Sequence, residues 1–141
     1  MRIILDTGVF FYPEALAMMR WYAAPIIVPS VVFAERARQL ARIGVHEEAL
    51  REKLDTFGAT IEALGPAEAT RFATRITDDK KWARLARDAF IAGHVRDDDR
   101  LFTTNVADFV EVGVPESQIL EVPAWRQRPK SSAGDGAARP R

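Results

Sequence analysis

The sequence predicts an α/β fold: a three-layer α/β/α domain with a central parallel sheet of four to five strands. Short β-branched runs bounded by turn residues alternate with segments of helical periodicity over residues 1–123. Such alternation is typical of βαβ units, which place helices on both faces of a parallel sheet. The length of 141 residues suits one domain of this kind.

The predicted strands are short apolar runs, as expected for parallel strands that are buried on both faces. The first, Ile3-Ile4-Leu5, ends at the turn residues Asp6-Thr7-Gly8, and the second lies between Pro25 and Pro29. We expect strands at 3–5, 26–28, 59–64, 100–104 and 119–122.

The segments between the strands have the spacing of amphipathic helices. Ser30 is a candidate N-cap and Gly44 a candidate end for the second of them. The last, with Trp82, Leu85, Ala86 and Ala89 at helical spacing, fits either one helix or two abutting ones. We expect helices at 13–23, 30–43, 46–57, 66–77 and 79–95.

The formal net charge of zero conceals an asymmetry between body and tail. Residues 124–141 are rich in Pro, Gly, Ser and Arg and carry a charge of +4, which leaves −4 on residues 1–123. A segment of this composition cannot bury enough apolar surface to order itself, so we expect a disordered, solvated tail, with RNA contact as the alternative.

Composition excludes several classes of protein. The absence of cysteine rules out disulfides, thiolate metal sites and a cysteine nucleophile. No apolar run is long enough to span a membrane, and the start of the chain does not read as a secretory signal, so we expect a cytoplasmic protein. No phosphate-binding glycine loop, dinucleotide fingerprint or supported Ser–His–Asp set is present.

Acidic residues near the carboxyl ends of the strands are the informative ones, because open parallel sheets bind ligands at that edge. Asp6 follows the first strand and fits either a site or a turn and helix cap. Glu35 lies early in the helix after the second strand and points away from its apolar stripe, toward a site or toward solvent.

Asp88 is the sharpest candidate. On a continuous helix it shares a face with Ile91, Ala92 and Val95, where a lone carboxylate is costly unless it is paired or coordinated. The alternatives are an N-cap for a new helix at Ala89, or pairing with Arg84.

The fourth predicted strand ends in the polar segment 103–109, which contains Thr103, Asn105 and Asp108 and otherwise reads as a loop with Asp108 as a cap. By contrast, the run Asp97-Asp98-Asp99 precedes that strand, and we expect it to be solvated. Converging oxygen ligands favour Mg²⁺ or Mn²⁺ over zinc. We expect His46 on the surface and His94 packed or partly exposed.

Four segments in this order resemble the PIN domain, and most of all VapC-type toxins of toxin–antitoxin pairs. They are Ile-Ile-Leu-Asp-Thr at 3–7, Val-Pro-Ser-Val-Val-Phe-Ala-Glu at 28–35, Asp-Ala-Phe-Ile-Ala at 88–92 and Leu-Phe-Thr-Thr-Asn-Val-Ala-Asp-Phe at 101–109. The resemblance implies a Mg²⁺- or Mn²⁺-dependent ribonuclease, a hydrolase of RNA phosphodiester bonds, which forms a homodimer and binds an antitoxin.

The resemblance also implies roles for individual residues. Asp6, Glu35 and Asp88 match the family's acidic residues, with Asp6 and Asp88 as metal ligands and Glu35 either orienting the attacking water or holding a second ion. Either Asn105 or Asp108 completes the site, and Thr7 and Thr103 orient the ligands. The chain departs from the family at Gly8, at Gly93 and at the neutral Asn105.

RNA binding beside an acidic site requires a basic rim. Arg38 and Arg42 share the Glu35 side of their helix and are the leading candidates, although a solvated helix face explains them equally well. The wider set of candidates is Arg36, Arg84, Arg87, Arg96 and Arg100.

Two other functions stay open. The first is a PIN-fold binding module with weak or no cleavage that acts through a protein or RNA partner. The second is another metal-dependent phosphohydrolase, although the haloacid-dehalogenase signature requires an aspartate where this chain has Gly8.

Overall fold

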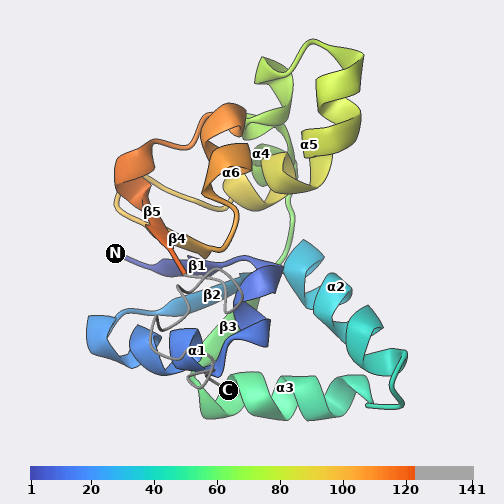
Figure 1. Ribbon diagram of the computed structural model, residues 1–141, viewed down its shortest axis with the longest axis vertical. Coiled ribbons are helices and arrows are strands. Elements are labelled where there is room, and N and C mark those ends of the chain that lie inside the picture. Colours follow the sequence, from blue (N-terminus) through green and yellow to red (C-terminus); the bar gives the residue numbers. More distant parts are fainter. Residues whose placement is uncertain (123–141) are drawn as a thin grey trace, which may run out of the picture.

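A computed structural model describes residues 1–122 and shows one all-parallel sheet of five strands in the order β3-β2-β1-β4-β5. Helices cover the sheet in layers (Figure 1), with α4, α5 and α6 above it and α1 and α3 below it in that view. The predicted α/β/α fold class is confirmed. The tail predicted at 124–141 lies outside the described residues.

All five predicted strands form, and they pair in parallel. The central strand β1 has no exposed side chain, and its register aligns Ile3 with Ile26 of β2 and with Arg100 of β4. The strands span Ile3–Leu5 (β1), Ile26–Pro29 (β2), Ala59–Glu62 (β3), Arg100–Thr103 (β4) and Ile119–Glu121 (β5).

The helices occupy the predicted segments, mostly with shorter bounds. They span Pro13–Met19 (α1), Ser30–Ala41 (α2), Glu47–Thr56 (α3), Pro66–Arg71 (α4), Asp79–Ala92 (α5) and Val106–Val112 (α6). Short 3₁₀ helices lie at Thr7–Phe11 (η1), Arg20–Tyr22 (η2), Ala73–Arg75 (η3) and Glu116–Gln118 (η4).

Two details of the helix predictions were wrong, and one helix was not predicted. Ser30 is the first residue of α2, whose N-cap is Pro29, and the Ser30 hydroxyl accepts a hydrogen bond from the Leu64 N–H at 3.1 Å. The segment at 66–77 divides into α4 and η3. The segment after β4, for which a polar loop was the alternative to a site, forms α6, with Phe109 and Val112 buried against the core.

Gly93 lets α4 and α5 approach each other closely. A Cβ at Gly93 would lie 1.8 Å from the backbone carbonyl oxygen of Glu68 in α4, a position that no side chain can share. The departure from the family's residue at this position therefore has a packing reason in this chain.

None of the helices within residues 1–122 combines the length and apolar character needed to cross a bilayer.

Candidate active site at the β1–β4 switch point

The carboxyl ends of β1 and β4 lie side by side where the strand order reverses. From β1 the chain builds outward through β2 and β3, and then returns to the other side of β1 with β4 and β5. Side chains at such a switch point face a crevice between oppositely directed connections, which is where open α/β sheets bind ligands. Asp6 follows β1 and Thr103 ends β4, so both stand at this crevice.

Asp6 is buried and held from both sides. Its Oδ1 accepts the Thr7 N–H at 2.7 Å and so caps η1, as the cap interpretation expected. Its Oδ2 accepts the Thr103 hydroxyl at 2.7 Å, and the same Thr103 oxygen accepts the Asn105 N–H at 2.9 Å. These bonds fix the carboxylate in one orientation, and Thr103 orients it as the resemblance implied.

Glu35 reaches the same place from the second turn of α2. Its Oε1 accepts a short hydrogen bond from the Thr7 hydroxyl. Thr7 therefore links the carboxylates of Asp6 and Glu35, one through its backbone N–H and the other through its side chain. Of the two interpretations left open for Glu35, the structure favours the strand edge over solvent, because its side chain is 33% exposed and both carboxylate oxygens accept hydrogen bonds.

Asp88 lies inside α5, because this helix is continuous and no new helix begins at Ala89. The predicted burial on the apolar face is confirmed: Asp88 is 4% exposed. Burial raises the pKa of this carboxyl to about 6; the charge of Arg87 opposes the shift, and the charges of Asp6 and Asp108 add to it.

Arg87 joins the three acids, and sequence reasoning did not find this role. Its guanidinium donates to Glu35 Oε2 at 2.5 Å, to Asp88 Oδ1 at 2.5 Å, and through Nη2 to Asp6 Oδ1 at 2.7 Å and Thr7 Oγ1 at 2.9 Å. Burial lowers the pKa of the guanidinium, but the bond to Glu35 and the charges of Asp6 and Glu35 outweigh burial, so its pKa is raised. Arg87, one of the residues considered for a basic rim, therefore points into the carboxylate centre.

Asn105 and Asp108 form a separate pair beside this centre. The Asn105 side-chain amide donates to Asp108 Oδ2 at 2.8 Å, and Arg84 donates to Asp108 Oδ1 at 3.2 Å. Neither side chain hydrogen-bonds to the carboxylates of Asp6 or Asp88. Asp108 is nevertheless near enough to raise the pKa of Asp88 by its charge. The possible pairing of Arg84 with Asp88 is not seen, because Arg84 binds Asp108 and Glu111.

Arg38 and Arg42 are exposed on α2 and near its end, on the predicted face. Arg36, also on α2, stacks 4.9 Å from the centroid of the Phe11 ring instead. Arg96 and Arg100 belong to the opposite end of β4, where Arg100 bonds backbone carbonyls of the preceding turn. Those two residues are therefore poor rim candidates.

The donor atoms at the centre are of the chemical type that hard divalent cations prefer, although their present arrangement serves Arg87. Asp6, Glu35 and Asp88 present carboxylate oxygens to a single point, the guanidinium of Arg87. Carboxylate oxygens are the ligands that Mg²⁺ and Mn²⁺ prefer. Among residues 1–122, however, no three His, Cys, Asp or Glu side chains are arranged as a group that could hold a metal ion. In the observed structure, these carboxylate oxygens accept hydrogen bonds from the guanidinium of Arg87.

A second ionic cluster lies away from this centre and corrects one prediction. Asp99 was expected to be solvated, but it is 2% exposed and accepts from Arg2 Nη2 at 2.8 Å. Arg2 also binds Glu62 at 2.8 Å, and Glu62 in turn contacts His94 Nδ1 at 2.7 Å. The buried His94 is the packed histidine expected, and its Nε2 has no hydrogen-bond partner in the described part of the chain.

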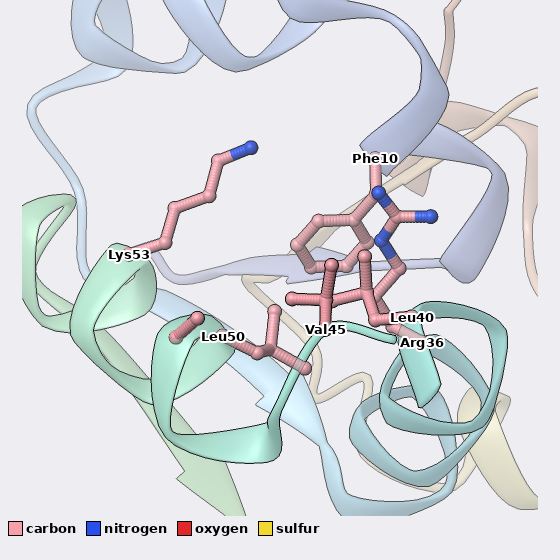
Figure 2. A pocket seen from close by; sticks show the side chains of 7 residues that line it. Phe10, Arg36, Leu40, Val45, Leu50 and Lys53 are labelled. Carbon is pink, nitrogen blue, oxygen red and sulfur yellow. The ribbon is translucent and has the colours of Figure 1, made fainter. Parts of the chain in front are cut away.

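An apolar pocket lies between α2, α3 and η1, separate from the carboxylates (Figure 2). Phe10, Leu40, Val45 and Leu50 line it, and Figure 2 shows the charged ends of Arg36 and Lys53 beside it. Burial lowers the pKa of Arg36 there. His46, exposed as predicted, is the N-cap residue of α3.

A scan against protein-family models found no matching family, and a search of curated proteins found no match for this chain.

Proposed function

We propose that this protein is a Mg²⁺- or Mn²⁺-dependent endoribonuclease of the PIN type, and the toxin of a toxin–antitoxin pair. One observation carries the proposal: Asp6, Glu35 and Asp88 come from three separate elements and meet at the switch point of a parallel sheet. Keeping three carboxylates together opposes stability, because like charges repel and burial disfavours ionisation. Such an arrangement is typical of functional sites.

Asp6 and Asp88 are the proposed metal ligands, and Asp108 or Asn105 would complete the set from α6. A divalent ion held by these residues would lower the pKa of a bound water and neutralise charge on the scissile phosphate. Thr103 and the Thr7 N–H hold Asp6 in one orientation, which supports its role as a ligand. Glu35, which accepts from the Thr7 hydroxyl, would orient the attacking water or hold a second ion.

RNA is the proposed substrate, and the cytoplasm is the proposed location. The exposed cations Arg38 and Arg42 continue along α2 from Glu35, so a strand of RNA entering the crevice would meet positive charge there. Their contribution is electrostatic, and it should weaken as salt concentration rises.

The homodimer is proposed to form through α1 and η2. Among the apolar side chains of this region, Trp21 is 84% exposed, Tyr22 38% and Met18 36%. By contrast, Leu50 and Leu54 of α3 are buried in the core of the chain itself, so that helix does not offer an apolar surface. We expect Trp21→Ser to shift the protein from dimer toward monomer, measured by light scattering after size-exclusion chromatography, whereas an unchanged mass would contradict this interface.

The antitoxin is proposed to occupy the apolar pocket between α2 and α3. An apolar side chain flanked by acidic residues would match the lining of Phe10 and Leu40 and the cations Arg36 and Lys53.

A binding module with weak or no cleavage is the second candidate. It is favoured by Arg87, whose guanidinium holds the carboxylate centre, and by the neutral Asn105, whose amide is bonded to Asp108. In that case the site would recognise a partner without hydrolysing RNA.

The decisive experiment compares RNA cleavage by the parent protein with that by Asp6→Asn and Asp88→Asn in Mg²⁺ or Mn²⁺. We expect each variant to lose activity by about 100-fold or more, because each removes a ligand charge from the metal. The assay measures initial rates on a fluorescent single-stranded RNA.

Two controls make the result specific. EDTA must abolish the parent's activity, since contaminating metal-independent ribonucleases survive chelation. Glu116→Gln, an exposed substitution in η4, should cleave like the parent. Equal cleavage by all variants would refute the site, and no cleavage by the parent would favour the binding module.

A further inference from the structure

The Arg87 guanidinium uses its donors on the same oxygens that a metal ion would need. Its Nε, Nη1 and Nη2 atoms bind Glu35, Asp88 and Asp6, each at 2.7 Å or less. A guanidinium is a planar fork with five N–H donors and matches carboxylates closely. A divalent ion bound directly by Asp6 and Asp88 would lie where this fork now lies. The two cations therefore compete for one position.

The contacts show that Arg87 belongs to this centre and not to the surface ion pairs of α5. Arg84, one turn earlier, makes its pairs with Asp108 and Glu111 on the exposed side of α6, with half of its side chain exposed. Arg87 instead contacts two carboxylates whose side chains are 5% and 6% exposed, Asp6 and Asp88. Buried carboxylates require a counter-charge, and in the described chain Arg87 is the cation that touches all three acids.

Building on the proposed metal-dependent function, we propose that Arg87 is a built-in counter-cation that fills the carboxylate centre of the metal-free protein and must withdraw before a divalent ion binds. The site is thus held together without metal, and metal affinity is set by a competition within the chain.

Arg87 is the member of the centre that can withdraw in this proposal. Its side chain is 36% exposed, whereas that of Asp88 is 6% exposed. Rotation about the flexible stem would move the charge from the centre to its mouth and leave Asp88 on the helix. The displaced cation would then be available to a phosphate group of RNA, which is the rim role expected from the sequence.

The test measures Mn²⁺ binding by calorimetry on the full chain after removal of metals, at about pH 8, so that the carboxyl of Asp88 is ionised. Arg87→Met removes the charge and keeps an apolar stem. Arg87→Lys keeps the charge but lacks the fork. Lys81→Gln, an exposed position earlier in α5, is the matched control for loss of one positive charge, and Asp6→Asn removes a proposed ligand.

We expect Arg87→Met to bind Mn²⁺ about tenfold more tightly than the parent, or better, with Arg87→Lys in between. Lys81→Gln should match the parent, and Asp6→Asn should bind weakly or not at all. In the absence of metal, Arg87→Met should melt at a lower temperature than the parent, and added Mn²⁺ should raise its melting temperature more than it raises that of the parent.

The remaining outcomes distinguish failure of the competition from failure of the proposed function. If Arg87→Met binds Mn²⁺ no more tightly than the parent while Asp6→Asn abolishes binding, the competition is refuted and the metal site stands. If neither the parent nor Arg87→Met binds Mn²⁺, both proposals fail. If Arg87→Met binds more tightly but no variant cleaves RNA, the competition holds and the ribonuclease assignment fails. Should Arg87→Met not fold, the comparison of Arg87→Lys with the parent decides.

Discussion

At the scale of single residues, Asp88 shows most clearly that the candidate site buries an ionisable group at a cost in stability. The carboxyl is 4% exposed on a helix face that also buries Leu85, Ile91 and Ala92. Burial raises its pKa to about 6, against an ordinary value near 3.9. The Asp88 carboxyl therefore holds its proton more strongly in the folded chain than in the unfolded chain, and ionisation of Asp88 opposes folding.

The sign of the resulting pH dependence follows directly. Between about pH 4 and pH 6 the unfolded state has already lost the proton that the folded state keeps, so the free energy of unfolding falls as pH rises through this window. The loss from this group is at most about 3 kcal/mol. We expect urea unfolding in EDTA to show this fall in the free energy of unfolding for the parent. For Asp88→Asn, the free energy of unfolding should depend less on pH. The same slope in both proteins would contradict a raised pKa.

Residue chemistry also explains which site residues could be predicted. Asp6 follows β1 directly, Glu35 lies early in the helix after β2, and Asp88 is a charge on an apolar helix face, so local patterns identify all three. Arg87 could not be found in this way, because an arginine in an exposed helical pattern looks like any solvated cation. The one available signal was charge balance, since three converging acids require a neighbouring cation.

At the scale of elements, the contact of α4 with the end of α5 depends on one missing methyl group. The chain ends α5 at Gly93, over which the backbone of α4 passes. Arg71 at the end of α4 reinforces the contact by donating to the carbonyl oxygen of Val95. This packing anchors the end of the helix that carries Asp88.

We therefore expect Gly93→Ala to lower the free energy of unfolding by about 2 kcal/mol or more, because the added carbon meets the Glu68 backbone and forces two helices apart. Gly65→Ala is the matched control. Its added carbon would meet only the Glu68 carboxylate, at 2.7 Å, and that side chain can move. Chemical denaturation of both variants measures the difference in the free energy of unfolding. Similar losses in the two variants would show that α4 can move aside at little cost, which would contradict the prediction.

Element boundaries were predictable where a local signal marks them, and otherwise not. The five strand runs were found because they are short apolar or β-branched runs near turn residues, although only β1, β2 and β4 prove to be largely buried. Helix α6 was missed because it is only seven residues long and follows the polar run Thr103-Thr104-Asn105, which resembles a loop, so burial of Phe109 and Val112 is needed to stabilise it.

At the scale of the whole molecule, an ionic cluster ties the start of β1 to the start of β4. Arg2 donates to Asp99 through both its backbone N–H and its guanidinium, and the Arg96 N–H donates to the same carboxylate. Burial raises the pKa of Asp99, but these bonds outweigh burial and leave it below its ordinary value. The parallel register explains why these residues meet. It sets Ile3 beside Arg100, so Arg2 and Asp99, the residues just before them, lie side by side. Predicting this contact from the sequence would have required the order of the strands.

We expect Asp99→Asn to lower the free energy of unfolding by about 3 kcal/mol near neutral pH, because it leaves Arg2 without its buried partner. Since the pKa of Asp99 is lowered on folding, its contribution is present above about pH 4 and is lost as pH falls below the ordinary aspartate value. The parent should therefore lose more stability on acidification than the variant does.

Glu47→Gln supplies the comparison, since it breaks an exposed pair with Arg51 in which both side chains are 53% exposed. That change should cost less than about 1 kcal/mol. If Asp99→Asn costs no more than Glu47→Gln in denaturation experiments, the cluster contributes little to the fold.

The position of β1 in the middle of the sheet bears on how this protein is made. Asp6 is translated nearly a hundred positions before Thr103, the residue of β4 that donates to its carboxylate. Asp88 also follows Asp6 only after three strands have been translated. The order of the strands therefore delays assembly of the acidic centre until β4 has been translated.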